Sequence, residues 1–356
     1  MIVTLTALAV AAPVAGAFGH RQLRRKAAAE QLRITTPNGI DESGFVRIGG
    51  IDQWIQIRGE DLRNPVLLEI HGGPGASNLP FTTRTRDWER HFTVVRWDMR
   101  GAGKTFGHTG ADAQGEMSLA RMELDALEVT QHVRSRLGVD QVLLVANSFG
   151  SMIGLRLARS HPELYSAYVG TDQNISAGGA NHAAYDALVR RLEQQDKRKQ
   201  LAVLADLGRE RSAWTAEQLM RFNKLVFNTD PLTVNTLKTV VLHDMWFSPL
   251  HTLRELRAGF QGQTFSEQLG PQAVSIDERA EGTDFRIPVF FFQGDSDVMT
   301  PPEPARRFLT EVTAPVKDFA LIEEASHFAS FRHPERFLDL LLTEVRPVIT
   351  GARSVR

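Results

Sequence analysis

The sequence predicts an α/β fold in which a mainly parallel, doubly wound sheet is interrupted by an inserted helical cap. From residue 65 onward, short apolar runs alternate with helical patterns, an order that is typical of parallel sheets covered by helices. This alternation stops between residues 176 and 284, where several helices are expected, and resumes at residue 288. We therefore expect a sheet core in two parts, residues 40–175 and 285–350, with a helical cap over residues 176–284 between them.

Length and composition limit the possible classes of function. The chain has 356 residues, of which 42% are hydrophobic, and a formal net charge of −1. This length fits one large domain with an insertion, or two domains. The near-neutral charge argues against a nucleic-acid partner, which requires a basic protein surface. The chain contains no cysteine, which excludes disulfides and thiol chemistry, and its sequence shows no zinc-type cluster of ligands.

The N-terminal segment, residues 1–28, combines an almost wholly apolar run over residues 2–18 with a basic flank. Three interpretations compete: a cleaved signal peptide, a membrane anchor, and a buried or frayed helix. The basic residues follow the apolar run, which is the wrong order for a signal peptide, and the run is at the short limit for a membrane span. We predict membrane attachment through residues 2–18, with the rest of the chain in the cytoplasm by the positive-inside rule. A wholly cytoplasmic protein and an exported protein are the alternatives.

The expected elements follow in order along the chain, after a polar linker through Glu42. Residues 45–48 and 53–57 alternate between apolar and polar side chains, which predicts two half-buried antiparallel strands. Apolar runs predict the remaining strands at residues 65–70, 92–97, 142–145, 167–169, 288–292 and 319–322. Helical patterns predict helices at residues 117–137, through Leu155 and Leu157, and at residues 334–348.

Ser148 lies where an apolar strand is expected to meet a helix. The surrounding residues, from Val145 to Ser151, have the form small-x-Ser-x-Gly, with Ala146 at the position that glycine usually holds. A serine at such a junction projects its hydroxyl outward, with a helix N-terminus behind it, as in a nucleophile elbow. The turn excludes bulk at the first position because it passes close to the backbone, and alanine is the next smallest residue. We therefore predict Ser148 as a nucleophile.

A serine nucleophile needs a base within hydrogen-bond reach and a third group that orients the base. Asp297 follows the strand expected at residues 288–292, and His327 follows the strand expected at residues 319–322. Taken singly, such an aspartate is usually a turn residue and such a histidine a loop residue. However, the C-terminal ends of parallel strands meet at one edge of a sheet. The chain order and these positions predict Ser148, Asp297 and His327 as a catalytic triad.

The segment from His71 to Gly75 directly follows the strand at residues 65–70. Its glycines allow the backbone to approach a ligand closely and to point an amide toward it. Amides of this kind stabilise the oxyanion of an acyl-transfer intermediate by on the order of 3 kcal/mol each. We predict the N–H groups of Gly73 and Phe149 as an oxyanion hole, with a plain Gly-Pro turn as the alternative.

Together these motifs resemble the α/β-hydrolase superfamily and, more narrowly, its proline iminopeptidase branch, the prolyl aminopeptidases among the serine peptidases. The resemblance covers about residues 40–350 and includes the loops His71 to Gly75 and Asp98 to Lys104. It implies Ser148 as nucleophile, His327 as base and Asp297 as the group that orients the base.

The resemblance also implies structural roles for Asp98 and Arg100, which would brace the loop near the serine. The chain departs from the branch at Ala146 and Phe149, where glycine and tryptophan are usual. Members of the branch bind a free α-amino group through acidic side chains of the cap. The acidic cap residues of this chain match no motif, and a solvated helix face explains each of them better than a binding role: Glu193, Asp206, Asp230 and Asp244.

These residues predict a serine hydrolase that works by acyl transfer and needs no metal or organic cofactor. The expected substrate is a small molecule or short peptide, with an amide that carries a small N-terminal residue as first choice. A carboxylesterase with the same residues and a non-catalytic ligand-binding homologue are alternatives. Trp246 and Phe247 of the cap are expected to line an apolar substrate pocket, although aromatic residues there usually pack the cap onto the core.

Overall fold

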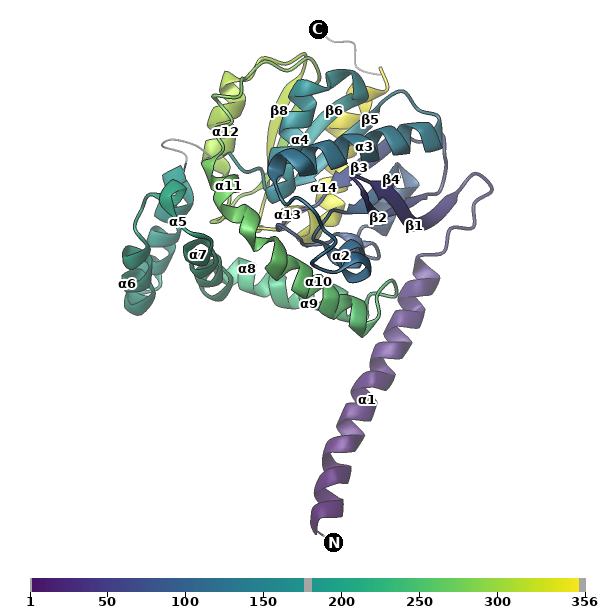
Figure 1. Cartoon of the computed structure of the whole chain (residues 1–356), viewed down its shortest axis with the longest axis vertical. Helices are drawn as coiled ribbons and strands as arrows, with labels where there is room; N and C mark the ends of the chain where they lie inside the picture. Colours follow the sequence, from purple (N-terminus) through teal and green to yellow (C-terminus); the bar gives the residue numbers. More distant parts are fainter. Residues whose placement is uncertain (1, 176–180, 352–356) are drawn as a thin grey trace.

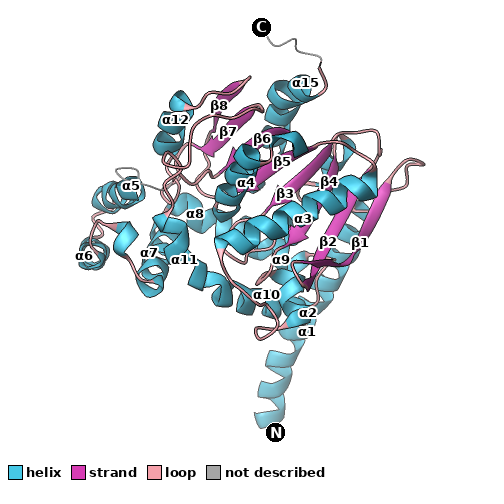
Figure 2. Cartoon of the chain, turned by 45° about the horizontal axis from the view of Figure 1, so that its top comes forward, coloured by secondary structure: helices cyan, strands magenta, loops and turns pink. Residues whose placement is uncertain are grey.

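An eight-stranded sheet forms the centre of the molecule (Figures 1 and 2). The computed structural model describes the backbone of residues 2–175 and 181–351, and the side chains of residues 16–175 and 182–351. The strand order is β1-β2-β4-β3-β5-β6-β7-β8. The β1–β2 and β2–β4 pairs are antiparallel, and the other pairs of neighbours are parallel. The predicted fold class is therefore confirmed.

Each expected strand is present, with ends that differ by a few residues. The strands are β1 Ile40–Ile48, β2 Ile51–Gly59, β3 Val66–Ile70, β4 Thr93–Asp98, β5 Val142–Asn147, β6 Tyr165–Thr171, β7 Val289–Gly294 and β8 Lys317–Ile322. The register pairs Leu67 of β3 with Leu143 of β5 and Ile70 with Ala146. The carboxyl ends of β3 and β5 therefore lie side by side, where the loop after β3 meets the residues that precede Ser148.

The long helices that flank the sheet were predicted, whereas some of the short ones were not. They are α2 Gly103–Thr109, α3 Leu119–Leu137, α4 Phe149–Ser160, α12 Pro302–Glu311, α13 Ala329–Arg332, α14 Pro334–Leu340 and α15 Arg346–Ile349. A π-helical turn, Leu341–Val345, joins α14 to α15, so the helix predicted at residues 334–348 is continuous. The sequence did not predict α2 and α12, because a periodic pattern over so few turns is hard to distinguish from a loop.

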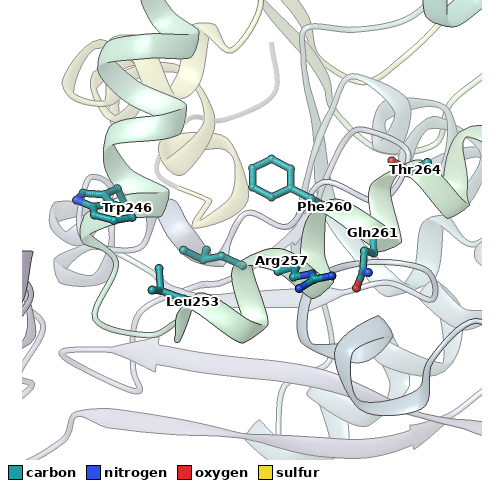
Figure 3. A pocket seen from close by; sticks show the side chains of 7 residues that line it. Trp246, Leu253, Arg257, Phe260, Gln261 and Thr264 are labelled. Carbon is teal, nitrogen blue, oxygen red and sulfur yellow. The ribbon is translucent and has the colours of Figure 1, made fainter. Parts of the chain in front are cut away.

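The described residues between β6 and β7 form helices and no strand. These are α5 Asn181–Gln194, α6 Arg198–Leu207, α7 Ala216–Thr229, α8 Pro231–Thr236, α9 Leu242–Phe247, α10 Leu253–Ser266 and α11 Gly270–Ser275. The predicted cap begins at residue 176, and residues 176–180 lie outside the described part. A cavity of about 600 Å³ lies on α10, lined by residues of that helix and by Trp246 (Figure 3).

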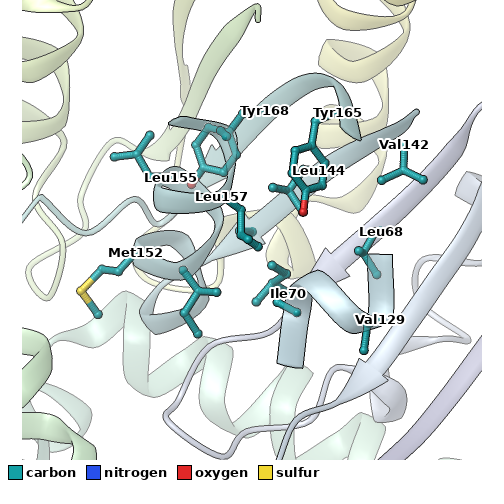
Figure 4. Packing of buried hydrophobic residues seen from close by; sticks show 14 of the residues in the cluster. Leu68, Ile70, Val129, Val142, Leu144, Met152, Leu155, Leu157, Tyr165 and Tyr168 are labelled. Atoms are coloured by element: carbon teal, nitrogen blue, oxygen red, sulfur yellow. The ribbon is translucent and has the colours of Figure 1, made fainter. Parts of the chain in front are cut away.

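The core of the sheet is double-sided, because alternate residues of the parallel strands point to opposite faces. On one face, Leu68 and Leu144 belong to a cluster with Met152 of α4 (Figure 4). On the other face, Leu67 belongs to a cluster with Phe337 of α14. All five side chains are at most 1% exposed, and each such burial stabilises the fold by about 1.5–3 kcal/mol. Burial on both faces explains why these strands are continuous apolar runs in the sequence.

The N-terminal helix α1, Ile2–Gln31, leaves the body of the molecule with its N-terminus farthest from the sheet (Figure 1). Its C-terminal half meets the cap, where the Arg21 Nε–H donates to the carbonyl of Trp246 (2.9 Å) and the Arg25 Nε–H to that of Ser248 (3.0 Å). The linker was expected to continue through Glu42, but it ends earlier, because α1 reaches Gln31 and β1 begins at Ile40. The helix continues to Gln31 because alanines and long side chains favour it, and pairing with β2 extends β1 back to Ile40.

The predicted anchor, residues 2–18, falls largely outside the residues whose side chains the structure describes. Across the described residues, none of the helices has the length and apolar character that crossing a membrane requires.

Candidate active site

Ser148 sits at a tight turn between β5, which ends at Asn147, and α4, which begins at Phe149. Its backbone has φ 52° and ψ −120°, a region that costs a residue with a Cβ atom about 1–3 kcal/mol. The turn persists because its surroundings are tightly packed. A Cβ added at Gly150 would lie 2.4 Å from the carbonyl oxygen of His71, so only glycine fits where α4 passes the loop after β3.

Ala146, the departure from the usual first glycine of this motif, is accommodated by a glycine on the facing helix. A Cβ added at Gly154 would lie 2.7 Å from the Cβ of Ala146 and 2.8 Å from the ring of Tyr168. The space that the Ala146 methyl occupies is therefore the space that a side chain at position 154 would need. The alanine leaves the turn at Ser148 intact.

The structure brings Ser148, Asp297 and His327 together at the carboxyl edge of the sheet. The Nε2 atom of His327 lies 2.9 Å from the Ser148 Oγ, and its Nδ1 lies 2.8 Å from Oδ2 of Asp297. Asp297 and His327 are each 3% exposed, whereas the serine is half-buried. The same aspartate accepts the N–H groups of Met299 (2.7 Å) and Thr300 (3.0 Å), which hold its carboxylate in place.

The charges around His327 favour a proton on its ring. Burial alone lowers the pKa of His327, but the carboxylates of Asp297 and Asp172 outweigh it and raise the pKa to about 9. Burial likewise raises the pKa of Asp297, and the charge and hydrogen bond of His327 outweigh it, so that the pKa is lowered overall. Because Nδ1 faces an ionised carboxylate, the neutral ring carries its proton on Nδ1. Nε2 is then free to accept the proton of Ser148.

Asp172, which the sequence analysis did not single out, is a second carboxylate beside His327. It directly follows β6, is buried, and accepts the N–H groups of Phe328 (3.1 Å) and Ala329 (3.3 Å). Burial raises its pKa to about 6, against the opposing charge of His327. The signal was present in the sequence, because Asp172 follows a strand that ends at the same edge as the strands before Ser148 and Asp297.

Asp172, Asp297 and His327 each offer an atom within 4.8 Å of the others, a spacing that a metal ion could bridge. Both ring nitrogens of His327 are already within hydrogen-bond distance of protein atoms, Nδ1 of Asp297 and Nε2 of Ser148. A metal ligand would have to give up one of these contacts. In this arrangement both ring nitrogens of His327 are engaged by protein side chains.

The loop from His71 to Gly75 lies against the serine. A Cβ added at Gly72 would lie 2.9 Å from the Ser148 Cβ, and Gly73 has φ 123°. His71 holds this loop: its Nε2 accepts the Met99 N–H (3.1 Å), so its Nδ1 carries a proton and donates to the Gly72 carbonyl (2.9 Å). Burial lowers the pKa of His71 to about 4, which keeps the ring neutral.

The residues for which the resemblance implied structural roles are buried in bracing contacts. Asp98 accepts the Lys104 N–H (2.7 Å). The Arg100 Nε–H donates to Asp125 (2.7 Å), and its Nη2 donates to the Gly49 carbonyl (2.9 Å). These contacts join the loop after β4 to α3 and to the β1–β2 turn.

A buried network below the elbow also escaped the sequence analysis. The Asn78 amide donates to Asn147 (3.2 Å) and to Glu69 (3.3 Å), and the Arg96 guanidinium lies 2.8 Å from the same glutamate. Asn147 immediately precedes the serine, so this network holds the start of the turn. No short motif marks it, because its members come from separate strands and a loop.

Of the four acidic cap residues, Asp230 approaches the histidine loop. Its Oδ2 accepts the hydroxyl of Thr233 (2.6 Å), and the hydroxyl of Ser326, next to His327, lies 2.9 Å from that of Thr233. Asp230 is buried and lies 3.1 Å from the Arg191 guanidinium. The other three lie elsewhere: Asp244 pairs with Arg84, Asp206 pairs with Arg221, and Glu193 is exposed.

The structure does not join Trp246 and Phe247 to the triad. The Trp246 ring lies 6.1 Å from that of Phe18, and the Phe247 ring lies 5.6 Å from that of His20, both on α1. The aromatic side chains near His327 are others: Phe328 follows it directly and stacks with Phe227 of α7 at 6.5 Å. The sequence could not distinguish these two sets, because which side of the cap faces the sheet depends on how its helices pack.

Comparisons with known proteins bear on the family and the fold. A family model described as the alpha/beta hydrolase fold matches residues 65–334. A probable aminopeptidase, YbaC, of Bacillus subtilis (strain 168) is 24% identical over 306 residues, which cover 84% of this chain and 94% of that protein. The resemblance to the aminopeptidase branch in the sequence analysis is confirmed at this level.

Two solved structures share the fold over most of the chain. A proline iminopeptidase-related protein from Thermus thermophilus superposes with a TM-score of 0.54 at 17% identity, covering 88% of this chain and 100% of that chain. A membrane phospholipase A, a bacterial virulence factor, superposes with a TM-score of 0.59 at 18% identity, covering 99% of this chain and 100% of that chain. At these identities the likeness shows the fold and not the activity. The family match spans most of the chain and covers strands β3 to β8 of the sheet, and the chain therefore belongs to the α/β-hydrolase family.

Proposed function

We propose that this protein is a serine hydrolase that works by acyl transfer, with Ser148 as nucleophile, His327 as base and Asp297 as the group that orients the base. The observation that carries the proposal is the continuous chain of contacts from the Ser148 Oγ to Nε2 of His327 (2.9 Å), and from Nδ1 to Asp297 (2.8 Å). These distances are those required of a nucleophile and its base before any substrate binds.

The reaction has two steps. His327 takes the Ser148 proton as the Oγ attacks a carbonyl carbon, and the N–H groups of Gly73 and Phe149 are proposed to bind the oxyanion that forms. His327 then protonates the leaving amine or alcohol, which departs as the acyl-enzyme forms. Water, deprotonated by His327, attacks the acyl-enzyme, and the proton returns to the Ser148 Oγ as the acid is released.

We propose an amide or peptide with a free N-terminus as the first substrate class. The name of the Bacillus subtilis relative supports it. We propose that the buried carboxylate of Asp230, which reaches the histidine loop through Thr233 and Ser326, binds the α-amino group.

A carboxylesterase is the second candidate, and one observation favours it. The guanidinium of Arg191 already lies 3.1 Å from Asp230, so the carboxylate has less net charge to offer an ammonium group. Ester substrates need no such recognition of charge. A ligand-binding protein without activity would keep the fold, but ligand binding alone does not require the contact between Ser148 and His327.

A substrate panel separates these possibilities. Aminoacyl-arylamides and short-chain aryl esters are supplied to the wild type, to Ser148→Ala, and to Ser160→Ala as a matched control at the exposed end of α4. We expect turnover to fall at least on the order of 10⁴-fold in Ser148→Ala, because the nucleophile is lost, and to be unchanged in Ser160→Ala. Equal labelling of wild type and Ser148→Ala by an active-site serine probe would show that the assignment is wrong.

A further inference from the structure

Exposed apolar side chains gather where α1, α9 and α10 meet. They are Phe18, Leu242, Trp246, Leu253 and Phe260, with exposed fractions between 37% and 49%. The Phe18 and Trp246 rings lie 6.1 Å apart, and Trp246, Leu253 and Phe260 all line the cavity on α10 (Figure 3). Large apolar side chains are ordinary when scattered singly on a surface, but a contiguous group marks a surface that meets a partner.

The two sides of α10 differ in what they contact. Its inner side packs on the loops near the active site, where Ser266 donates to the Gly101 carbonyl (3.0 Å) and Glu255 pairs with Lys104. The residues that line the cavity recur along α10 at the spacing of one helical stripe: Leu253, Leu256, Arg257, Phe260, Gln261 and Thr264. A stripe of this spacing normally faces the core of a protein, whereas Leu253 and Phe260 of this one are 42% and 49% exposed.

Basic side chains lie on the same helices as this apolar group. Arg24 and Lys26 of α1 and Arg254 and Arg257 of α10 are exposed, and none of them pairs with a carboxylate among the described side chains. The nearby acids are already neutralised, since Asp244 of α9 pairs with Arg84 and Glu255 of α10 pairs with Lys104. The face therefore combines apolar side chains with a surplus of positive charge.

We propose that this face, formed by α1, α9 and α10, docks on the surface of an anionic lipid bilayer. Phe18, Trp246 and Phe260 would enter the headgroup region while the arginines contact lipid phosphates, as in helices that lie in the membrane interface. The apolar run at residues 2–18 leaves the molecule on this side (Figure 1). A second copy of the chain fits less well, because a twofold contact would bring the same positive charges together.

A single-cysteine probe tests the docking in the full-length protein. The chain has no cysteine, so Phe260→Cys carries the sole attachment point for an environment-sensitive fluorophore, and Leu124→Cys, at a 50% exposed position on α3, is the matched control. With vesicles of phosphatidylcholine and phosphatidylglycerol, we expect blue-shifted emission and several-fold weaker quenching by aqueous iodide at position 260. Neither change is expected at position 124.

Three results would overturn the proposal. The first is a label at position 260 that iodide quenches equally with and without vesicles, although the protein sediments with them, which would mean attachment through residues 2–18 alone. The second is no binding to the vesicles. The third is protection of position 260 that rises with protein concentration in the absence of lipid, which would assign the face to a second copy.

Charge variants test the electrostatic part separately. We expect Arg254→Gln and Arg257→Gln each to weaken binding to the anionic vesicles by about fivefold, the gain per basic side chain at such a surface. Arg47→Gln on β1 should bind as the wild type does. Equal binding of all these variants, or binding that added salt leaves unchanged, would contradict docking through charge.

Discussion

The carboxyl edge of the sheet and the helical cap differ in the contacts that hold their residues in place. At the sheet edge, Ser148, Asp297 and His327 follow strands whose neighbours and register are set by backbone hydrogen bonds, and each side chain is held by further contacts. In the cap, α5, α6 and α7 pack around an apolar cluster that also includes Val298, the residue after Asp297. The cap meets the edge at a few points, such as the contact of Thr233 with Ser326. This difference fits the roles proposed above, with chemistry at the edge and selection of the substrate by the cap.

Replacing Asp297 with asparagine makes the strongest test of the edge. We expect Asp297→Asn to lower kcat on the order of 10⁴-fold, because an amide no longer holds the His327 proton on Nδ1. Kinetics on the best arylamide or ester, with circular dichroism to check folding, measure the effect. A variant that keeps most of its activity would mean that Asp172 orients the ring instead, and Asp297→Asn combined with Asp172→Asn would then be the decisive variant.

Asp230→Asn tests whether the cap selects substrates by charge. If Asp230 binds an α-amino group, the KM of Asp230→Asn for aminoacyl-arylamides rises about 10- to 100-fold, which corresponds to the loss of one hydrogen bond to a charged group. The kcat of this variant on aryl esters stays unchanged. Asp206→Asn, an exposed acid of the same cap, is the control. Equal effects of Asp230→Asn on amides and esters would show that the residue supports the fold rather than selects the substrate.

Asp172→Asn produces a smaller change, in pH dependence. If His327 is the base, as proposed, its ring must be neutral to act, and we expect kcat/KM to rise with pH through its pKa. Burial lowers that pKa, and the charges of Asp297 and Asp172 raise it to about 9. Removing one of these charges lowers the pKa, so the midpoint of the rise should move to lower pH by on the order of one unit.

Asp295→Asn provides the control for that shift. Asp295 accepts the N–H groups of Glu324 (3.2 Å) and Ala325 (3.4 Å), and so braces the same loop. It is not among the charges that shift the pKa of His327. We expect the pH midpoint of the rise in kcat/KM to be the same in Asp295→Asn as in the wild type. Equal shifts in the Asp295 and Asp172 variants would assign both residues a purely structural role.

The smallest effect concerns packing behind the turn. Gly154→Ala should destabilise the protein by about 1–3 kcal/mol, because its methyl would overlap that of Ala146. Ala146→Gly in the same chain should restore part of the loss, because the Tyr168 ring, 2.8 Å from the added Cβ, still crowds it. Urea unfolding of the two single variants and the double variant measures the coupling. Additive effects would mean that these two positions do not share the space.

The sheet and the residues at its edge could be predicted because their signals are local. A strand buried on both faces is a continuous apolar run, and a residue that follows such a strand must lie at the edge where the parallel strands end. The same rule would have found Asp172 if it had been applied to the end of β6. It could not find Asn78 or Glu69, whose contact depends on the pairing of distant segments.

Placement within the cap could not be predicted in this way. Trp246 and Phe247 were expected beside the substrate, and the structure places them against α1. The amphipathic pattern of a short helix indicates that one face is buried without identifying the partner. Asp230, one of four equivalent acids in the sequence, is distinguished by its burial and by its contact with Thr233.

The sequence by itself determined the α/β core, the turn at Ser148 and the order of serine, acid and histidine. These features follow from patterns among neighbouring residues: the spacing of apolar side chains along strands and helices, and the glycines at the turns. Only the tertiary structure decided that a second carboxylate lies beside His327, that Asp230 approaches the histidine loop, and that an apolar face of α10 stays uncovered. Each of these depends on side chains far apart in the chain, and their proximity is set by how the helices pack on the sheet.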